Sequence, residues 1–394
     1  MKVKFLFIHL FIFLLTSSGF SQEKLRYDIF KNEPINFNGQ IGQDFDVIRL
    51  QSGRIVVKKV TVPEFSKGTD VTIKISLRSN GDRWDKSGSC FVITNPNQIS
   101  IMNVSKKEQV FPKESYIKEK FGGVLATEKY NPALELIRFM TPFGVGYFST
   151  DEDSHRRPVY IPNWEKQVVW EQDISPLSSE VTGTFYIGVW VDSWTKEGYN
   201  VDVSLTYSNR PLKKIKVMPL VNTIAYVDGQ SLPDFFAETS LEHWLSFKKN
   251  AKNVKLYYIT TGHGGHSGGD EFIKIKNSIY FDNKLVLDTI PWRDDCASFR
   301  RFNPTSGVWL KKDSASYIDF DAKVYKIKEI EERIASSDLS RSNWCPGSSV
   351  APIIIELGDL NAGKHTFKIK IPATKAEEDK LNHWLVSSYL TFEE

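Results

Sequence analysis

A short polar loop carries the first residues that could do chemistry. Residues 80–85 read NGDRWD, so that Asp82 and Asp85 flank Trp84 directly after an alternating apolar run at 71–77. A carboxylate can act as a general base or as a nucleophile, and an indole can stack on a sugar ring. Asn, Gly and Asp also favour turns, so taken alone the segment most often indicates an ordinary polar loop.

A glycine-rich segment further along the chain holds a second group of reactive side chains. Residues 261–271 read TGHGGHSGGDE and contain His263, His266, Asp270 and Glu271. Glycines let the backbone approach a ligand closely, and the neighbouring acids and histidines favour a site. On this segment alone, a loop whose glycines only permit turns is the commoner outcome.

A third segment, SRSNWCPG at 340–347, places Arg341 and Trp344 beside Cys345. A guanidinium can hold a carboxylate or stabilise a developing oxyanion. The other interpretation is a turn fixed by a disulfide, with a tryptophan in the core.

The elements that would position these segments are strands. Apolar residues alternate with polar ones at 71–77, 201–207 and 367–371, the period of strands with one buried face. Turn sequences such as Asn80-Gly81 and Asp228-Gly229 separate such runs. We therefore predict an all-β chain of sandwiches or jelly rolls. One helix is predicted at 322–335, where four apolar residues share a helical face.

The N-terminus predicts export. Lys2 and Lys4 precede an apolar run at 5–15, and small residues follow at Gly19 and Ser21. This is the layout of a signal peptide covering 1–21. The run is too short to span a bilayer, and no later segment is a better candidate, so no membrane anchor is expected.

Length and charge limit the remaining possibilities. The mature part of the chain suggests two domains, predicted at 22–210 and 211–394. A net charge of +3 without a long basic run disfavours nucleic acid as a partner. Three cysteines in an oxidising compartment allow one bridge and leave one thiol over.

Five segments, in register along the chain, resemble the peptide-N-glycosidase F family. Trp84-Asp85 matches the motif of its primary catalytic aspartate, and His263 and Glu271 lie in a match to the loop of its second essential acid. The other matches are 138–146, the DSW sequence at 192–194 with Gly198 and Tyr199, and Cys296 with the run 341–347.

The resemblance implies two adjacent antiparallel eight-stranded jelly-roll domains with the site between them. It implies hydrolysis of the amide that joins an Asn side chain to the first N-acetylglucosamine of a glycan. N-glycosylated peptides and glycoproteins would be the partners, and we expect a secreted monomer that needs no cofactor. It also implies a Cys296–Cys345 disulfide. Cys90, in the apolar run Ser89 to Ile93, would then be a free buried thiol.

The family's site residues carry over onto this sequence. Asp85 would be the principal catalyst, Glu271 a second acid that positions the sugar or a water, and Asp192 an auxiliary acid. Arg341 would keep Asp85 ionised, since a nearby cation lowers a carboxyl pKa. The other residues carried over as substrate-binding are Trp84, Lys86, Trp194, His263 and Trp344, of which Trp194 and Trp344 would line the sugar cleft.

Several positions depart from the family pattern. Asp192 stands where the best-known member has glutamate, and His263 stands where it has tryptophan, which weakens the sugar contact expected there. Lys86 replaces an arginine and cannot form the same bidentate fork. Residues 91–135 and 308–337 are longer than their counterparts.

Two other classes fit part of the sequence. One is a glycan-binding module without turnover, against which the joint presence of Asp85, Glu271 and Arg341 argues. The other is a copper monooxygenase on a similar paired fold, because imidazoles bind copper. No repeated ligand spacing supports copper, so no metal site is predicted. The histidines it would use are His263 and His266, with others from His155, His243, His365 or His383.

Overall fold

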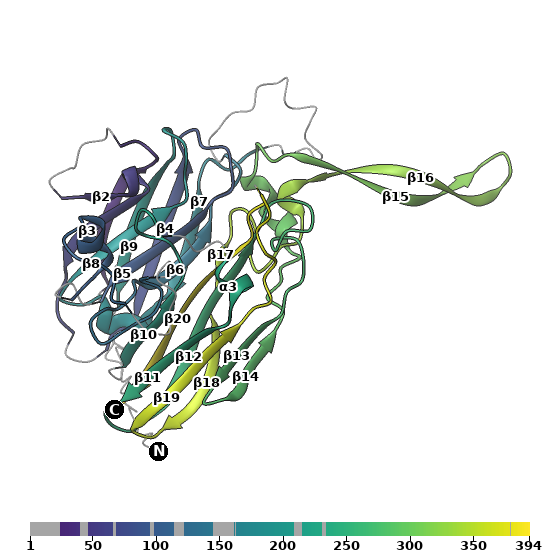
Figure 1. Cartoon of the computed structure of the whole chain (residues 1–394). Helices are drawn as coiled ribbons and strands as arrows, with labels where there is room; N and C mark the ends of the chain where they lie inside the picture. The colour runs from purple at the N-terminus through teal and green to yellow at the C-terminus, as the bar shows by residue number, and fades with distance from the viewer. Residues whose placement is uncertain are drawn as a thin grey trace, which may run out of the picture.

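The computed structural model describes residues 24–39, 46–65, 68–94, 98–113, 122–144, 161, 163–208, 215–230, 234–378 and 380–394. The predicted signal peptide at 1–21 and the predicted domain boundary at 210 lie outside these ranges. Within them the chain is built from β-strands (Figure 1). The short helices are α1 (Ile101–Ser105) and α3 (Phe235–Glu238), with 3-10 turns η1 (Gln51–Gly53), η3 (Ser175–Glu180), η4 (Cys296–Phe302) and η5 (Ser336–Asp338).

Two facing antiparallel sheets form the N-terminal sandwich. One has the order β1 (Leu25–Ile35), β9 (Tyr199–Tyr207), β4 (Val71–Ser79), β7 (Val168–Asp173). The other has the order β17 (Ser349–Val350), β6 (Leu134–Met140), β5 (Ser87–Ile93), β8 (Thr184–Val191), β3 (Ile55–Thr61), β2 (Ile48–Leu50).

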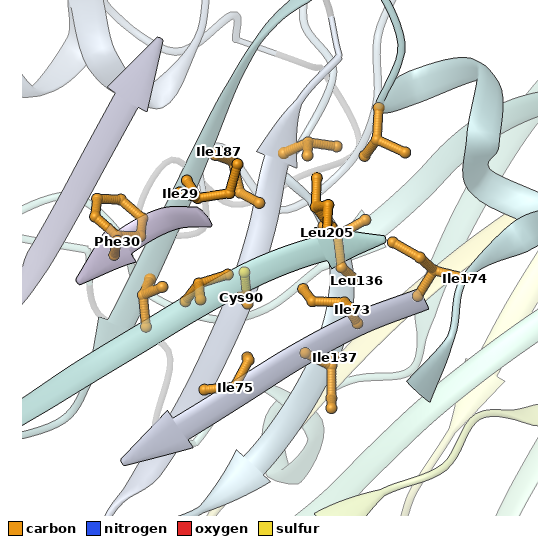
Figure 2. Close-up of a cluster of buried hydrophobic side chains, with 14 of the residues drawn as sticks. Ile29, Phe30, Ile73, Ile75, Cys90, Leu136, Ile137, Ile174, Ile187 and Leu205 are labelled. Atoms are coloured by element: carbon orange, nitrogen blue, oxygen red, sulfur yellow. The ribbon is translucent and has the colours of Figure 1, made fainter. Parts of the chain in front are cut away.

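The alternating sequence explains how these sheets pack. In β4, Val71, Ile73, Ile75 and Leu77 are fully buried, while the polar residues between them point away from the core. Ile73 and Ile75 meet side chains from the opposite sheet, including Ile137 of β6 (Figure 2). Burying each such side chain stabilises the fold by roughly 1.5–3 kcal/mol.

The C-terminal sandwich repeats this construction with two four-stranded sheets. The first has the order β10 (Lys216–Asn222), β20 (His383–Glu393), β12 (Ala251–His263), β18 (Ile353–Leu360). The second has the order β11 (Leu241–Phe247), β19 (Gly363–Lys370), β13 (Asn277–Phe281), β14 (Lys284–Thr289). The prediction of an all-β chain with two adjacent antiparallel sandwich domains is confirmed.

The two sandwiches adjoin through backbone and side-chain contacts. Strand β17 belongs to the C-terminal half of the sequence but pairs with β6 of the N-terminal sandwich. The fully buried Arg138 of β6 donates hydrogen bonds to Leu385 O of β20 and to Thr261 Oγ1 of β12. The edges of the two domains are therefore held in a fixed relation.

The prediction of a helix at 322–335 is wrong. Most of this segment forms β16 (Val324–Ala335), which pairs along its whole length with β15 (Val308–Asp319). Together the two strands make a hairpin that projects from the body (Figure 1). Apolar residues spaced three and four apart resemble a helical stripe, but Val324 and Ile327 of that stripe are exposed, and the main-chain hydrogen bonds run to β15 instead.

Both cysteine predictions are confirmed. Cys296 and Cys345 form a disulfide, and Cys90 is a free thiol that is completely buried in the N-terminal core. Within the described residues, no helix has the length and apolar character needed to cross a membrane.

Candidate functional site

Asp85 lies in a loop that is tied down from several sides. Between β4 and β5 the chain turns through Asp82, whose fully buried carboxylate accepts hydrogen bonds from Trp84 N at 3.1 Å and Ser193 Oγ at 2.8 Å. Tyr199 donates its hydroxyl to Trp84 O at 2.7 Å. The loop that presents Asp85 is thereby linked to the loop after β8, which carries Asp192.

Glu271 stands at the end of the glycine-rich segment that follows β12. Gly264 has a φ of +153°, and a Cβ there would lie 2.3 Å from Asn382 Oδ1, so this close approach requires glycine. The buried Asp270 accepts a hydrogen bond from Trp384 Nε1 at 2.9 Å. Ser342 N donates to Glu271 O at 2.9 Å, which joins this loop to the Arg341 segment.

Arg341 bridges the two acids. Its Nε lies 2.7 Å from Glu271 Oε1, and its Nη2 lies 3.6 Å from Asp85 Oδ2. Its Nη1 donates to Ser336 O and Leu339 O at 2.9 and 3.1 Å. The side chain is 2% exposed. The two carboxylates, one from each sandwich, thus contact the same buried guanidinium.

Burial dominates the electrostatics of this pair. It raises the pKa of Asp85 above its usual value, although Arg341 and Lys86 act in the opposite direction. Arg341 therefore lowers the pKa of Asp85 as expected, but burial has the larger effect and the net shift is upward. Burial also raises the pKa of Glu271 to about 7, Arg341 opposing and Asp85 reinforcing the shift. One cation facing two carboxylates favours a pair that holds one proton near neutral pH.

Asp192 is held by a residue that sequence reasoning missed. Arg54 Nη1 lies 3.1 Å from Asp192 Oδ1, and its guanidinium stacks 4.1 Å from the centre of the Trp194 ring. Trp194 Nε1 also donates to Asp192 Oδ1 at 3.0 Å, and Phe37 packs against Trp194. Arg54 follows an ordinary turn in sequence, and no local pattern marks it.

Asp192 sits in a recess that desolvates it although 39% of its side chain is exposed, and this burial raises its pKa. Lys86 and Arg54 oppose that shift. Lys86 is half-buried and acts electrostatically on Asp85 and on Asp192. It therefore connects the acid pair with the auxiliary acid.

The structure separates the predicted aromatic residues into two groups. Trp84 and Trp194 are 55% and 57% exposed, so each offers a free face to a ligand. Trp344 is buried, and it supports Arg341, whose guanidinium lies 4.8 Å from the ring centre. Its predicted place on the wall of a sugar cleft is wrong, because no face is free.

His263 is also buried, so the predicted sugar contact is wrong at this position too. Its ring stacks between Trp344 and His383, and its Nε2 lies 2.8 Å from Thr261 Oγ1. Burial lowers the pKa of His263 well below its usual value. Three or more His, Cys, Asp or Glu side chains that could hold a metal ion do not gather anywhere among the described residues. His155, considered for copper, lies outside them.

The comparisons with known proteins cover both sandwiches. Residues 27–207 match the family model "Peptide-N-glycosidase F, N terminal", and residues 231–391 match "Peptide-N-glycosidase F, C terminal". A solved structure of PNGF-II is 34% identical with a TM-score of 0.79, and the match covers 94% of this chain and 65% of that one. The chain thus spans less than two thirds of that relative's length. No curated protein matches the chain.

More distant solved structures share the fold. Recombinant PNGase F is 14% identical with a TM-score of 0.58, and the match covers 94% of this chain and 96% of that one. PNGase F from Flavobacterium meningosepticum, a glycosylasparaginase, is 14% identical over the same shares with a TM-score of 0.53. At this identity the likeness shows the fold alone.

The fold and site define a protein of two adjoining antiparallel sandwiches in which each sandwich contributes one acid to a shared arginine. The two matched family models together span most of the sequence. The chain belongs to the peptide-N-glycosidase F family.

Proposed function

We propose that this protein hydrolyses the amide between an Asn side chain and the first N-acetylglucosamine of an N-linked glycan. The observation that carries the proposal is the buried Arg341 bridge between Asp85 and Glu271. It supplies a proton acceptor and a proton donor in one small volume. The exposed rings of Trp84, next to Asp85 in the chain, and of Trp194, which donates a hydrogen bond to Asp192, offer faces on which sugars stack.

The chemistry follows from the shared proton. An amide carbonyl is a poor electrophile, so water must be activated before it can attack. Asp85 would take a proton from water while the oxygen forms a bond to the carbonyl carbon of the Asn side chain. Glu271, with a pKa of about 7, would give its proton to the departing nitrogen as the C–N bond breaks. The products are Asp in the peptide and the released glycan, which carries the departing nitrogen as a glycosylamine.

Arg341 has two tasks in this scheme. It orients both carboxyl groups through its contacts at 2.7 and 3.6 Å, and its positive charge favours the state in which one of them is ionised. Its own position is fixed by the backbone carbonyls of Ser336 and Leu339 and by the ring of Trp344. Substrate is therefore not needed to assemble the pair.

We also infer that the protein works outside the cytoplasm, on glycopeptides or glycoproteins. The Cys296–Cys345 disulfide supports this inference, because such bonds persist in oxidising compartments.

A glycopeptide assay tests the proposed activity. Purified protein is incubated with a peptide that carries one N-glycan, and mass spectrometry follows Asn-to-Asp conversion and free glycan. We expect both products in equal amounts. Binding of the glycopeptide without conversion would show a glycan-binding protein instead. An Asp321→Asn variant, altered in the turn of the projecting hairpin, serves as the matched control and should keep full activity.

A further inference from the structure

The hairpin of β15 and β16 forms a sheet of its own, with strands of 12 residues each, and projects from the body of the molecule (Figure 1). A two-stranded ribbon is only marginally stable in water unless a further strand or layer packs on it. Within the described residues, each strand of the hairpin pairs only with the other. Both outer edges therefore present main-chain N–H and C=O groups with which a strand of another molecule can pair.

The hairpin also exposes large apolar side chains. Leu310 of β15 is 60% exposed, Phe320 in the turn is 83% exposed, and Ile327 of β16 is 76% exposed. Exposed apolar side chains that gather in one place mark a contact with another molecule. The residues along each edge indicate which molecule fits.

The edge of β16 is poorly suited to pairing with a second copy of itself. A two-fold axis through an antiparallel pair of identical strands sets the central residue opposite itself and its neighbours opposite one another. An axis at Ile330 therefore sets Glu329 opposite Glu331. Every other axis from Lys326 to Glu332 also sets like charges opposite each other, which destabilises the pairing. Such charges are one way in which edge strands avoid association.

The middle of β15 differs, because Ser314, Ala315 and Ser316 are small and uncharged. An axis at Ala315 sets Ser314 opposite Ser316. It also sets Asp313 opposite Tyr317, and no like charges meet along the strand. The β15 edge is therefore complementary to a second copy of itself.

The end of the strand favours this axis over its neighbour. With the axis at Ala315, Leu310 comes opposite Phe320, so two highly exposed apolar side chains cover each other on both sides of the axis. An axis at Ser314 also avoids like charges, but it sets Leu310 opposite Ile318. Ile318 is only 45% exposed and gains less from being covered.

We propose that β15 is an association edge, on which β15 of a second copy of this chain pairs antiparallel with the two-fold axis at Ala315. The two hairpins then form one continuous sheet with β16 at each outer edge. A lipid surface fits the hairpin less well, because its turn carries Asp319 and Asp321, and carboxylates disfavour insertion into a bilayer. Residues 308–337 are longer than their counterparts in the family, so the monomer expected from the resemblance does not bear on this edge. The association does not involve the acid pair and is independent of the proposed activity.

Sedimentation velocity of the full chain over a range of concentrations tests this inference. We expect the wild type to form a dimer whose fraction rises with concentration. Tyr317→Asp sets a carboxylate opposite Asp313 on both sides of the axis and should weaken association about tenfold. Adding Asp313→Lys restores opposite charges at both places and should recover the dimer, which damage to the hairpin alone would not allow.

Ile327→Asp is the matched control, because it adds the same charge at an exposed apolar position on the other strand. It should associate like the wild type. A monomer at every concentration would overturn the inference, and so would equal weakening by Tyr317→Asp and Ile327→Asp. A wild-type monomer that floats with phosphatidylcholine vesicles would assign the hairpin to lipid and would overturn it as well.

Cysteine cross-linking tests the register. Residues directly opposite each other in an antiparallel pair have Cα atoms about 4.5–5.5 Å apart, a separation that a disulfide can span. Ala315→Cys should therefore link two copies when treated with oxidised glutathione, and the completely buried Cys90 should not compete. Ser316→Cys is the control, because diagonal neighbours lie about 7–8 Å apart and should link poorly. Equal linking by both variants would contradict an axis at Ala315.

Discussion

At the scale of single residues, the proposed mechanism depends first on Asp85. We expect Asp85→Asn to lower the rate of glycan release by at least about 10²-fold, because Asn cannot accept a proton from water. The fold should survive, since burial already disfavours the charged form of Asp85 and Asn is nearly isosteric. Rates on a glycopeptide and the melting temperature are measured together. A folded Asp85→Asn protein with the wild-type rate would remove Asp85 from the mechanism.

The proposed role of Glu271 as proton donor predicts how activity depends on pH. If it donates the proton, activity should fall as pH rises through about 7, where its carboxyl loses that proton. Glu271→Gln should lower the rate by about 10²-fold or more and remove this limb of the profile. Asp192→Ala should lower activity less. Rates measured from pH 5 to 9 for wild type and Glu271→Gln test whether Glu271 donates the proton. A variant with an unchanged pH profile would contradict this role.

The same shift has a consequence for stability. The pKa of Glu271 is raised in the folded protein, so the native state binds this proton more tightly than the unfolded chain does. The stability that this bound proton contributes is fully present below the pKa of the unfolded chain, near 4.5, and is lost as pH rises through about 7. The melting temperature of the wild type should therefore fall over that window relative to Glu271→Gln.

The sequence predicted the acid pair better than its aromatic surroundings. Asp85, Glu271 and Arg341 come from three separate segments, and the structure brings them together. A core position for Trp344 was one of two interpretations that the sequence left open, and the burial of His263 was not expected, because exposure depends on packing between distant strands. Arg54 was missed for the same reason: its partners Asp192 and Trp194 lie about 140 residues further along the chain.

At the scale of elements, strict alternation was a reliable signal and mixed spacing was not. The runs at 71–77 and 201–207 each bury one face and form β4 and β9 as predicted. In 322–335 the apolar spacing suggested a helix, but apolar residues of this segment such as Val324 and Ile327 are exposed and do not pack against the core. Pairing with β15 decides its structure, and such pairing between strands is absent from any local pattern.

The hairpin of β15 and β16 should be dispensable for the fold. Its two strands form a separate sheet, and Leu310, Phe320 and Tyr325 are exposed, so its removal uncovers little of the core. Since Val308 pairs with Ala335, residues 309–334 can be replaced by an Asn-Gly turn. We expect the melting temperature to change by less than about 2 °C. A large loss in a thermal scan would show that the hairpin packs on the body.

At the scale of the whole molecule, the candidate site exists only while the two sandwiches keep their relation. Asp85 comes from one half of the chain, and Glu271 and Arg341 come from the other. The ion pair of Glu135 and Arg138 is completely buried at this junction, with Arg138 Nη2 lying 2.7 Å from Glu135 Oε2. The junction therefore controls both stability and activity.

Removal of one partner of this pair is the strongest test of the junction. Arg138→Met leaves the Glu135 carboxylate without its cation and also removes the hydrogen bonds to Leu385 O and Thr261 Oγ1. Breaking a buried pair in this way costs about 3–5 kcal/mol, whereas replacing both partners by apolar residues often costs little. We expect urea denaturation to show a large loss for Arg138→Met and a smaller one for the double variant Glu135→Met/Arg138→Met. Arg301→Met, which alters an exposed pair with Glu165, should leave the transition unchanged. Equal losses for the single and double variants would mean that packing, and not the uncompensated charge, holds the sandwiches together.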